Sequence, residues 1–205
     1  MLSTASDRTY ATTVGSQKVE LPLVPLSEEL TIALLICVDM GVSFAETAGR
    51  ELAELMRPAR PEIVVSVATM GIPLAIEASR ALGFDDYVIL HKTPKIHLGE
   101  SWAEPVYSIT TDKPQRLRMD PARVGAVRGR RVAVVDDVIS TGASLSSALR
   151  LVRRMDAEPV VIGTLMTEGG GWKSALGEDA ALVRTLGAMP LFHPDGEGGL
   201  TEDWG

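Results

Sequence analysis

The 205-residue sequence has little cysteine and no long apolar run, and both absences narrow the class of protein. The single Cys37 cannot form an internal disulfide. The longest apolar run, residues 32–38, ends at Asp39 and is too short to cross a bilayer. Residues 1–7 lack the basic region followed by an apolar region that is typical of a secretory signal. We therefore expect a cytoplasmic protein without a membrane partner.

Two common phosphate-binding motifs are also missing. The sequence contains neither the Gly-Lys-Ser/Thr of a Walker loop nor the Gly-x-Gly-x-x-Gly turn of dinucleotide-binding proteins. The formal net charge of −7 argues against nucleic acid as a partner. Residues 91–131 are a local exception, with nine Lys/Arg against four Asp/Glu. From residue 185 onward Lys and Arg are absent, and acidic residues alternate with glycine, so residues 191–205 are expected to form an acidic, mobile tail.

The most informative segment runs from Arg131 to Ser144. Residues 132–135 are apolar and mostly β-branched without alternation, which is typical of a buried strand in a parallel sheet. Asp136 and Asp137 end this predicted strand. Apolar residues then recur at helical spacing from Leu145 to Met155, so residues 140–144 form a loop between a strand and a helix N-terminus.

This loop is suited to a phosphate group. A helix N-terminus offers unpaired N–H groups and a partial positive charge, Gly142 allows close approach of the backbone, and the Ser140, Thr141 and Ser144 hydroxyls add donors. Asp136 and Asp137 would accept hydrogen bonds from ribose hydroxyls or coordinate a divalent cation. A simpler interpretation is that the aspartates end a strand and a hydroxyl caps a helix.

Residues Val134–Gly142 resemble the phosphoribosyl pyrophosphate (PRPP) motif of the type I phosphoribosyltransferases. The resemblance covers residues 28–168 and is greatest to the adenine branch. It implies that Asp136 and Asp137 hold the ribose and Mg²⁺, and it implies a homodimer. It also implies a 5′-phosphate loop composed of Val138, Ile139, Ser140, Thr141, Gly142, Ala143 and Ser144.

The order of predicted elements indicates an α/β fold with a doubly wound, mostly parallel sheet. Strands are expected at residues 63–67, 87–90, 132–135, 160–166 and 181–186. Residues 1–40 would form a small N-terminal β hood, with a hairpin turning at Gly15-Ser16. Residues 41–190 would form the PRPP-binding core, with a flexible lid at about 92–128. Ser43 and Glu46 predict a capping box, which opens a helix whose Ala45, Ala48, Leu52, Leu55 and Met56 face the core; a second helix is expected from Pro73 to Gly83.

A turn after the first core strand is a second candidate segment. It comprises Ala68, Thr69, Met70 and Gly71 and precedes a helix, so its N–H groups can bind an anion. The resemblance implies that this turn binds pyrophosphate. The family commonly has a basic residue where this chain has Met70, and a plain βα turn is the alternative.

A third segment opens the expected lid with His91, Lys92 and Lys95. The resemblance implies that Lys92 and Lys95 meet pyrophosphate and that Glu104 falls near the loop acid of adenine enzymes; His91 is a predicted PRPP-binding residue. The family's Leu-Glu-Tyr-Gly run is replaced here by residues 108–111, of sequence Ser-Ile-Thr-Thr. A long connection inside a compact domain is usually functional, although a solvated surface hairpin is the alternative.

A fourth segment follows the strand at residues 160–166. Glu168 can accept a hydrogen bond from an exocyclic amine, and Trp172 can stack on a base. The alternative is a glycine-rich loop with a packed tryptophan.

Together these segments predict an enzyme that transfers ribose 5-phosphate from PRPP to a purine base, adenine first, and releases pyrophosphate. Asp136, Asp137, Lys92 and Glu104 are the predicted catalytic residues, and Mg²⁺ is the predicted cofactor. The second hypothesis is a PRPP-sensing regulatory protein that has lost catalysis, which Met70 supports. Such a protein could bind RNA through the basic residues 113–131.

Overall fold

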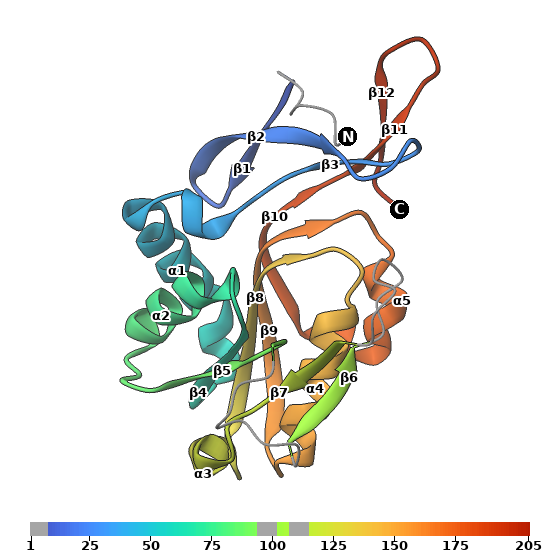
Figure 1. Cartoon of the computed structure of the whole chain (residues 1–205). Coiled ribbons are helices and arrows are strands. Elements are labelled where there is room, and N and C mark those ends of the chain that lie inside the picture. The colour runs from blue at the N-terminus through green and yellow to red at the C-terminus, as the bar shows by residue number, and fades with distance from the viewer. Residues whose placement is uncertain (1–7, 94–101, 107–114) are drawn as a thin grey trace.

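Five parallel strands form the centre of the protein (Figure 1). This computed structural model describes residues 8–93, 102–106 and 115–205. The strands lie in the order β10-β9-β8-β4-β5, and each neighbouring pair is parallel. Their bounds are β4 Ile63–Val67, β5 Tyr87–Leu90, β8 Arg131–Ile139, β9 Glu158–Glu168 and β10 Val183–Met189.

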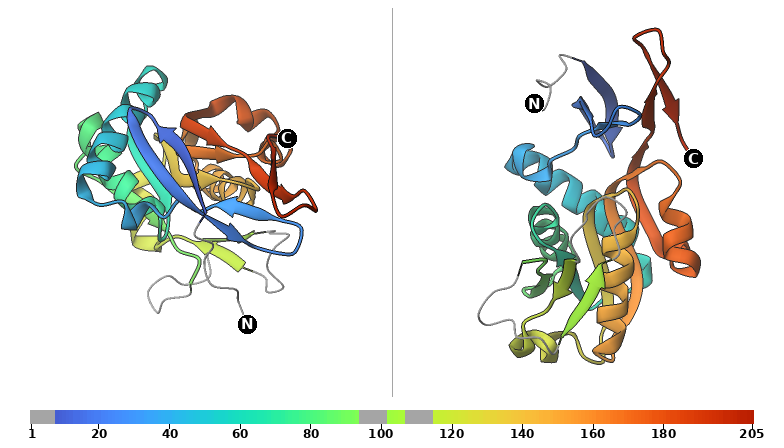
Figure 2. Two further views of the ribbon diagram at one scale, coloured as in Figure 1. Left: turned by 90° about the horizontal axis from the view of Figure 1, so that it is seen from above. Right: turned by 45° about the vertical axis from the view of Figure 1, so that its right-hand side comes forward.

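Helices cover both faces of this sheet. One face carries α1 (Val42–Met56) and α2 (Gly71–Leu82), and the other carries α4 (Ala143–Arg154) and α5 (Trp172–Leu176) (Figure 1, Figure 2). Successive side chains of a strand point to opposite faces. Val134 accordingly joins the core beneath α4, whereas Val135 joins the core beneath α1 and α2. The uninterrupted apolar run of β8 follows from this double coverage, and the predicted doubly wound α/β class is confirmed.

A second sheet, the hood, lies above the carboxyl ends of the core strands (Figure 1). Its order is β1-β2-β3-β11-β12, and its pairs are antiparallel. Its strands are β1 Thr9–Val14, β2 Gln17–Pro25, β3 Thr31–Ala33, β11 Leu191–Pro194 and β12 Leu200–Asp203. Both ends of the chain therefore build the hood. The expectation of a mobile tail is wrong for residues 191–203, because Phe192 pairs with Thr31 and the hairpin extends the sheet.

A two-stranded hairpin occupies the described part of the expected lid. β6 (Ala103–Val106) pairs antiparallel with β7 (Gln115–Arg118), and α3 (Val124–Val127) follows. Residues 94–101 and 107–114, which include Lys95 and the 108–111 run, lie outside the described residues. None of the described helices is long and apolar enough to cross a membrane.

Some of the predicted turns and helix ends are confirmed, and others are wrong. Gly15 turns the β1–β2 hairpin at φ 56°, and Gly83 ends α2 in the left-handed conformation that glycine favours. The predicted capping box is wrong, because α1 begins at Val42 after Gly41 and no side chain caps it. Leu55 is 42% exposed rather than buried. The helix α2 starts two residues before Pro73, at Gly71.

Candidate functional site

The two aspartates lie within β8, not after it. The strand continues through Asp136 and Asp137 to Ile139, and pairing of Asp136 with Thr164 and of Val138 with Met166 holds the backbone of both aspartates against β9. The Asp137 N–H donates to Asp136 Oδ1 at 3.1 Å, and the Thr164 hydroxyl donates to the Asp137 carbonyl at 2.9 Å. Burial raises the pKa of both aspartates; the neighbouring Asp137 charge raises that of Asp136 further, and the Lys92 charge opposes the shift at both.

A tight loop follows β8 and leads into α4. Gly142 has φ 77°, and a Cβ at this position would lie 3.2 Å from the Trp172 carbonyl oxygen, so conformation and space both favour glycine. The Thr141 hydroxyl accepts from the Ala143 N–H at 3.4 Å. Ser144 lies in the first turn of α4, where backbone N–H groups lack helical partners. This end of the helix is suited to a phosphate.

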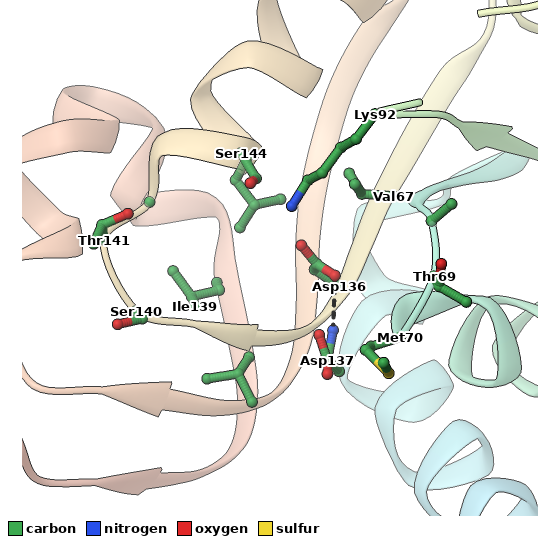
Figure 3. A pocket seen from close by; sticks show the side chains of 14 residues that line it. Val67, Thr69, Met70, Lys92, Asp136, Asp137, Ile139, Ser140, Thr141 and Ser144 are labelled. Atoms are coloured by element: carbon green, nitrogen blue, oxygen red, sulfur yellow. Dashed lines mark hydrogen bonds between the residues drawn. The ribbon is translucent and has the colours of Figure 1, made fainter. Parts of the chain in front are cut away.

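The 68–71 turn faces this loop from the neighbouring strand. The Ala68 N–H donates to Leu90 at 2.8 Å, which holds the start of the turn against β5. Gly71 lies against Asp136, because a Cβ at Gly71 would be 3.1 Å from Asp136 Oδ1. Met70 is 38% exposed and lines the same cavity as Thr69 and the aspartates. The turn and the Asp pair therefore form one continuous surface (Figure 3).

Lys92 extends toward the aspartates from the end of β5 (Figure 3). The His91 backbone forms two hydrogen bonds with Arg118 of β7, at 2.8 and 2.9 Å, and the Lys92 carbonyl accepts from the Arg118 guanidinium at 3.3 Å. These contacts fix the backbone from which Lys92 projects. His91 does not line either cavity described below among the described residues, whereas Lys92 lines both.

Two adjoining cavities lie at the carboxyl ends of the core strands, and the second of them is also lined by residues 26 and 32–35 on the hood side. The first, here the loop cavity, has a volume of about 200 Å³ and includes the 68–70 turn, the Asp pair and the 140–144 loop. The second, here the hood cavity, has a volume of about 450 Å³. They share Lys92, Asp137, Val138, Ser140, Thr141 and Ser144. The hood cavity adds mainly apolar residues, namely Leu26, Ile32, Ala33, Leu34, Leu35, Val106 and Met189, which the sequence did not mark because no polar motif accompanies them.

The two predicted base-binding residues separate in the structure. Glu168 ends β9, is 5% exposed and lines the hood cavity. Burial raises the pKa of its carboxyl, while a hydrogen bond from Ser140 opposes the shift. Trp172 is 8% exposed, packs in the core beneath α4, and donates its ring N–H to the Gly169 carbonyl at 3.1 Å. Trp172 lines neither cavity, so the structure supports the packed-tryptophan alternative.

Glu104 is not brought to either cavity among the described residues. It lies in β6 with a side chain 12% exposed, and its carboxylate forms ion pairs with Arg154 and with Arg150 at 3.5 Å, both in α4. The Arg154 guanidinium also lies over the Trp102 ring. In this structure the Glu104 carboxylate attaches the hairpin to α4, and the expected catalytic role of Glu104 stays a prediction.

The carboxylates of the loop cavity are suitable ligands for Mg²⁺, which prefers oxygen ligands. No group of three or more His, Cys, Asp or Glu suited to a metal occurs in the described part of the chain. Asp136 and Asp137 supply two carboxylates. Mg²⁺ in phosphate-transfer sites is typically held by one or two carboxylates together with substrate phosphates and water, so the pair is sufficient on the protein side.

A parallel sheet covered by helices on both faces, with a helix N-terminus and paired carboxylates at its carboxyl edge, defines the class of doubly wound α/β proteins, which bind their ligands at that edge. The chain belongs to the phosphoribosyl transferase domain family, which matches residues 44–183. Residues Val134–Gly142, which resemble the PRPP motif of that family, lie within that range.

Individual relatives differ in their named roles. The chain is 30% identical over 131 residues to a xanthine phosphoribosyltransferase of Laribacter hongkongensis, covering 63% of this chain and 68% of that protein. It is 29% identical over 155 residues to the transcriptional regulator GfcR of Methanosarcina mazei, covering 76% of this chain but 64% of the regulator. The fold is similar to that of adenine phosphoribosyltransferase from Saccharomyces cerevisiae, with a TM-score of 0.62, 20% identity, and 81% and 93% of the two chains covered.

Proposed function

We propose that this protein transfers ribose 5-phosphate from PRPP to a purine base and releases pyrophosphate. One observation carries the proposal: Asp136 and Asp137, Lys92, the 68–70 turn and the 140–144 loop line a single cavity. This cavity adjoins an apolar cavity of about 450 Å³, within the range of roughly 300–1,000 Å³ that small-molecule sites occupy. The arrangement suits a phosphorylated sugar in the first cavity and a heterocyclic base in the second.

The reaction needs charge stabilisation and alignment rather than a covalent nucleophile. The bond from ribose C1 to pyrophosphate breaks, the electron pair leaves with pyrophosphate, and a base nitrogen forms the new bond to C1, while the proton of the imidazole ring of the base passes to pyrophosphate or water. Asp136 and Asp137 accept the ribose hydroxyls, and the α4 N-terminus with Ser140 and Thr141 holds the 5′-phosphate. Lys92 and the 68–71 turn meet the departing pyrophosphate, whose charge grows in the transition state.

Magnesium completes the proposed site. Asp136 and Asp137 would share the ion with the phosphates of PRPP, and when bound it neutralises charge on the leaving group. Among the described residues that line the loop cavity, Lys92 is the only cation beside two aspartates. A polyanionic ligand therefore needs additional positive charge to bind there. Asp136 and Asp137 are the proposed metal ligands, and Glu104 is not one of the residues proposed to contact PRPP or Mg²⁺.

Adenine is the first acceptor to test, and the acceptor panel includes xanthine, hypoxanthine, guanine and orotate. The yeast adenine enzyme was solved with adenine and an imino-altritol bisphosphate, which supports the fold's capacity for a base beside a phosphorylated ring. The sequence relative from Laribacter hongkongensis is named for xanthine. Turnover measured with each base of the panel therefore identifies the acceptor.

Calorimetric titration with PRPP and Mg²⁺ tests the first half of the proposal. We expect saturable one-site binding that is lost when Asp136→Asn and Asp137→Asn are combined, because neutral amides at this buried edge cannot share a cation. Asp85→Asn, at an exposed residue before β5, is the control and should bind normally. Equal PRPP affinity in the double variant would contradict the assignment of the Asp pair.

A PRPP-sensing regulator is the second candidate, and Met70 favours it. An exposed methionine stands where a basic residue would strengthen pyrophosphate binding, and one relative is named a transcriptional regulator. Such a protein would bind PRPP but release no pyrophosphate with any base. A salt-dependent affinity for nucleic acid that changes on addition of PRPP would favour this second function.

A further inference from the structure

Lys92 lies beyond the hydrogen-bonded ladder of the central sheet. The strand β5 ends at Leu90, and Lys92 follows two residues later. The ammonium group of a lysine is carried by a flexible four-carbon stem, so its position depends on a fixed backbone. Lys92 is also the only cation among the described residues that line the loop cavity. The contacts that hold the Lys92 backbone therefore hold the positive charge of this cavity.

Arg118, the last residue of β7, makes these contacts. The His91 N–H donates to the Arg118 carbonyl at 2.8 Å, and the Arg118 N–H donates to the His91 carbonyl at 2.9 Å. One guanidinium nitrogen of Arg118 donates to the Lys92 carbonyl at 3.3 Å and to the Arg116 carbonyl at 3.2 Å. A single side chain thus joins the backbone just after β5 to the strand β7.

The backbone around Arg118 is itself firmly held. Its neighbours Leu117 and Met119 are fully buried in the core beneath α4, and the Met119 N–H donates to the Trp102 carbonyl at 3.0 Å. Arg118 is 8% exposed, and burial of a charged group costs free energy unless polar partners compensate for the lost water. An apolar side chain would fill the same space without that cost. The hydrogen bonds of the guanidinium are therefore what the arginine adds.

On this basis, and resting on the proposed function, we propose that Arg118 is a positioning residue that holds Lys92 at the pyrophosphate end of the site. Among the described residues Arg118 lines neither cavity, so it acts through Lys92 and not by touching PRPP. Without the guanidinium, the Lys92 carbonyl loses this partner and the backbone that carries the ammonium group gains freedom. Ordering a loosely held lysine when PRPP binds costs conformational entropy. The consequence is weaker binding of PRPP.

The test uses Arg118→Met, which keeps an unbranched side chain and removes its donors. We expect PRPP affinity, measured by calorimetry with Mg²⁺, to fall about tenfold, as for the loss of a hydrogen bond from a charged group. Arg118→Lys keeps a charged donor without the planar fork, so its affinity should lie between those of wild type and Arg118→Met. Arg123→Met is the matched control. Arg123 donates to the Tyr87 carbonyl at 3.2 Å, at the other end of β5, and its loss should leave PRPP affinity unchanged.

A double-mutant cycle with Lys92→Ala separates positioning from a general structural role. If Arg118 acts through Lys92, Arg118→Met should cost no further PRPP affinity once residue 92 is alanine, so the two losses should not add. Additive losses would show that Arg118 acts independently of Lys92 and would overturn the inference. Hydrogen exchange without ligand tests the contact itself: the peptide covering residues 87–93 should exchange faster in Arg118→Met than in wild type.

The outcomes separate this inference from the proposed function. PRPP affinity that is lost in Lys92→Ala but normal in Arg118→Met would overturn the role of Arg118 and leave the transferase function intact. Unchanged hydrogen exchange of residues 87–93 in Arg118→Met would also overturn the role of Arg118. Absence of PRPP binding by wild-type protein would overturn both proposals. If Arg118→Met does not fold, Arg118→Lys decides, and wild-type affinity with wild-type exchange in that variant would overturn the inference.

Discussion

Gly71 lies directly against Asp136: a Cβ at Gly71 would be 3.1 Å from Asp136 Oδ1, and closer still to the Ser66 hydroxyl oxygen. Gly71 begins α2 after the turn that follows β4, whereas Asp136 lies in β8, so their contact fixes the spacing between the 68–71 turn and the Asp pair. Both Ser66 and Asp136 are held by the central sheet and have little room to move. Gly71 thus allows the two halves of the loop cavity to approach.

We predict that Gly71→Ala weakens PRPP binding and lowers the free energy of unfolding by about 1–3 kcal/mol, the usual cost of overpacking a rigid site. Calorimetry and urea denaturation measure the two effects. Gly125→Ala in α3 is the control, since a Cβ there meets nothing within 4 Å and alanine is the better helix former. Equal PRPP affinity in the two variants would show that the contact does not shape the site.

The raised pKa of Asp136 predicts a specific pH dependence of stability without ligand. Because burial raises the folded-state pKa, the folded protein binds more protons than the unfolded chain above about pH 4, where unfolded aspartate ionises. This contribution to stability is present below that pH and is lost as pH rises through the folded-state value. Asp136→Asn should therefore lose less stability than wild type between pH 4.5 and 7.5 in urea denaturation. Parallel pH profiles would contradict the shift.

Met70→Arg should strengthen PRPP binding. The described residues lining the loop cavity provide one cation, Lys92, so a second cation beside the pyrophosphate position adds attraction that salt screens. We expect a gain of about 1.5–3 kcal/mol in binding free energy, as for a hydrogen bond to a charged group, and a steeper salt dependence. Val42→Arg adds the same charge at a residue that is 81% exposed in α1 and serves as the control. Equal gains in both variants would indicate only an overall charge effect.

Glu104→Gln should lower stability without changing PRPP affinity. The Glu104 carboxylate is nearly buried against Arg154 and Arg150, whose side chains are 47% and 41% exposed. Because the arginines remain partly solvated, the loss should be about 1–3 kcal/mol rather than the 3–5 kcal/mol of a fully buried pair. Glu54→Gln disrupts an exposed pair with Arg57 and is the control, which should leave stability nearly unchanged because solvent screens this pair. A large loss of PRPP affinity in Glu104→Gln would contradict this prediction and would indicate that Glu104 takes part in ligand binding.

Much of the central sheet could be predicted from the apolar patterns of the sequence. The strands β4 and β5 have the predicted bounds, because short apolar runs end at clear turn residues. The predicted β8 was too short, because two consecutive aspartates are typical of a strand end, whereas the backbone of Asp136 and of Val138 still pairs with β9. The C-terminal hairpin was missed for a related reason. Its exposed edge strand β12 is acidic, and only its pairing with β11 makes it ordered.

The candidate site also contains residues that the sequence marked and residues that it did not. Asp136, the 140–144 loop and Lys92 were found because their polar residues follow predicted strands, and the carboxyl ends of parallel strands meet at one edge. The apolar lining from Leu26 and β3 was missed, because nothing local distinguishes a cavity wall from a packed core. Trp172 and Glu104 are predicted site residues that line neither cavity in the described part of the chain. Each has chemistry suited to a ligand, but tertiary contacts use that chemistry for packing or ion pairing.

Pyrophosphate release from PRPP is the most direct test of the central claim. Purified protein with PRPP and Mg²⁺ is incubated with adenine, guanine, hypoxanthine, xanthine and orotate in parallel, and pyrophosphate and the nucleoside monophosphate are quantified together. The account predicts stoichiometric formation of both products with at least one purine, and neither product with the combined Asp136→Asn and Asp137→Asn variant. PRPP binding without release for every base would contradict a transferase and favour the sensor.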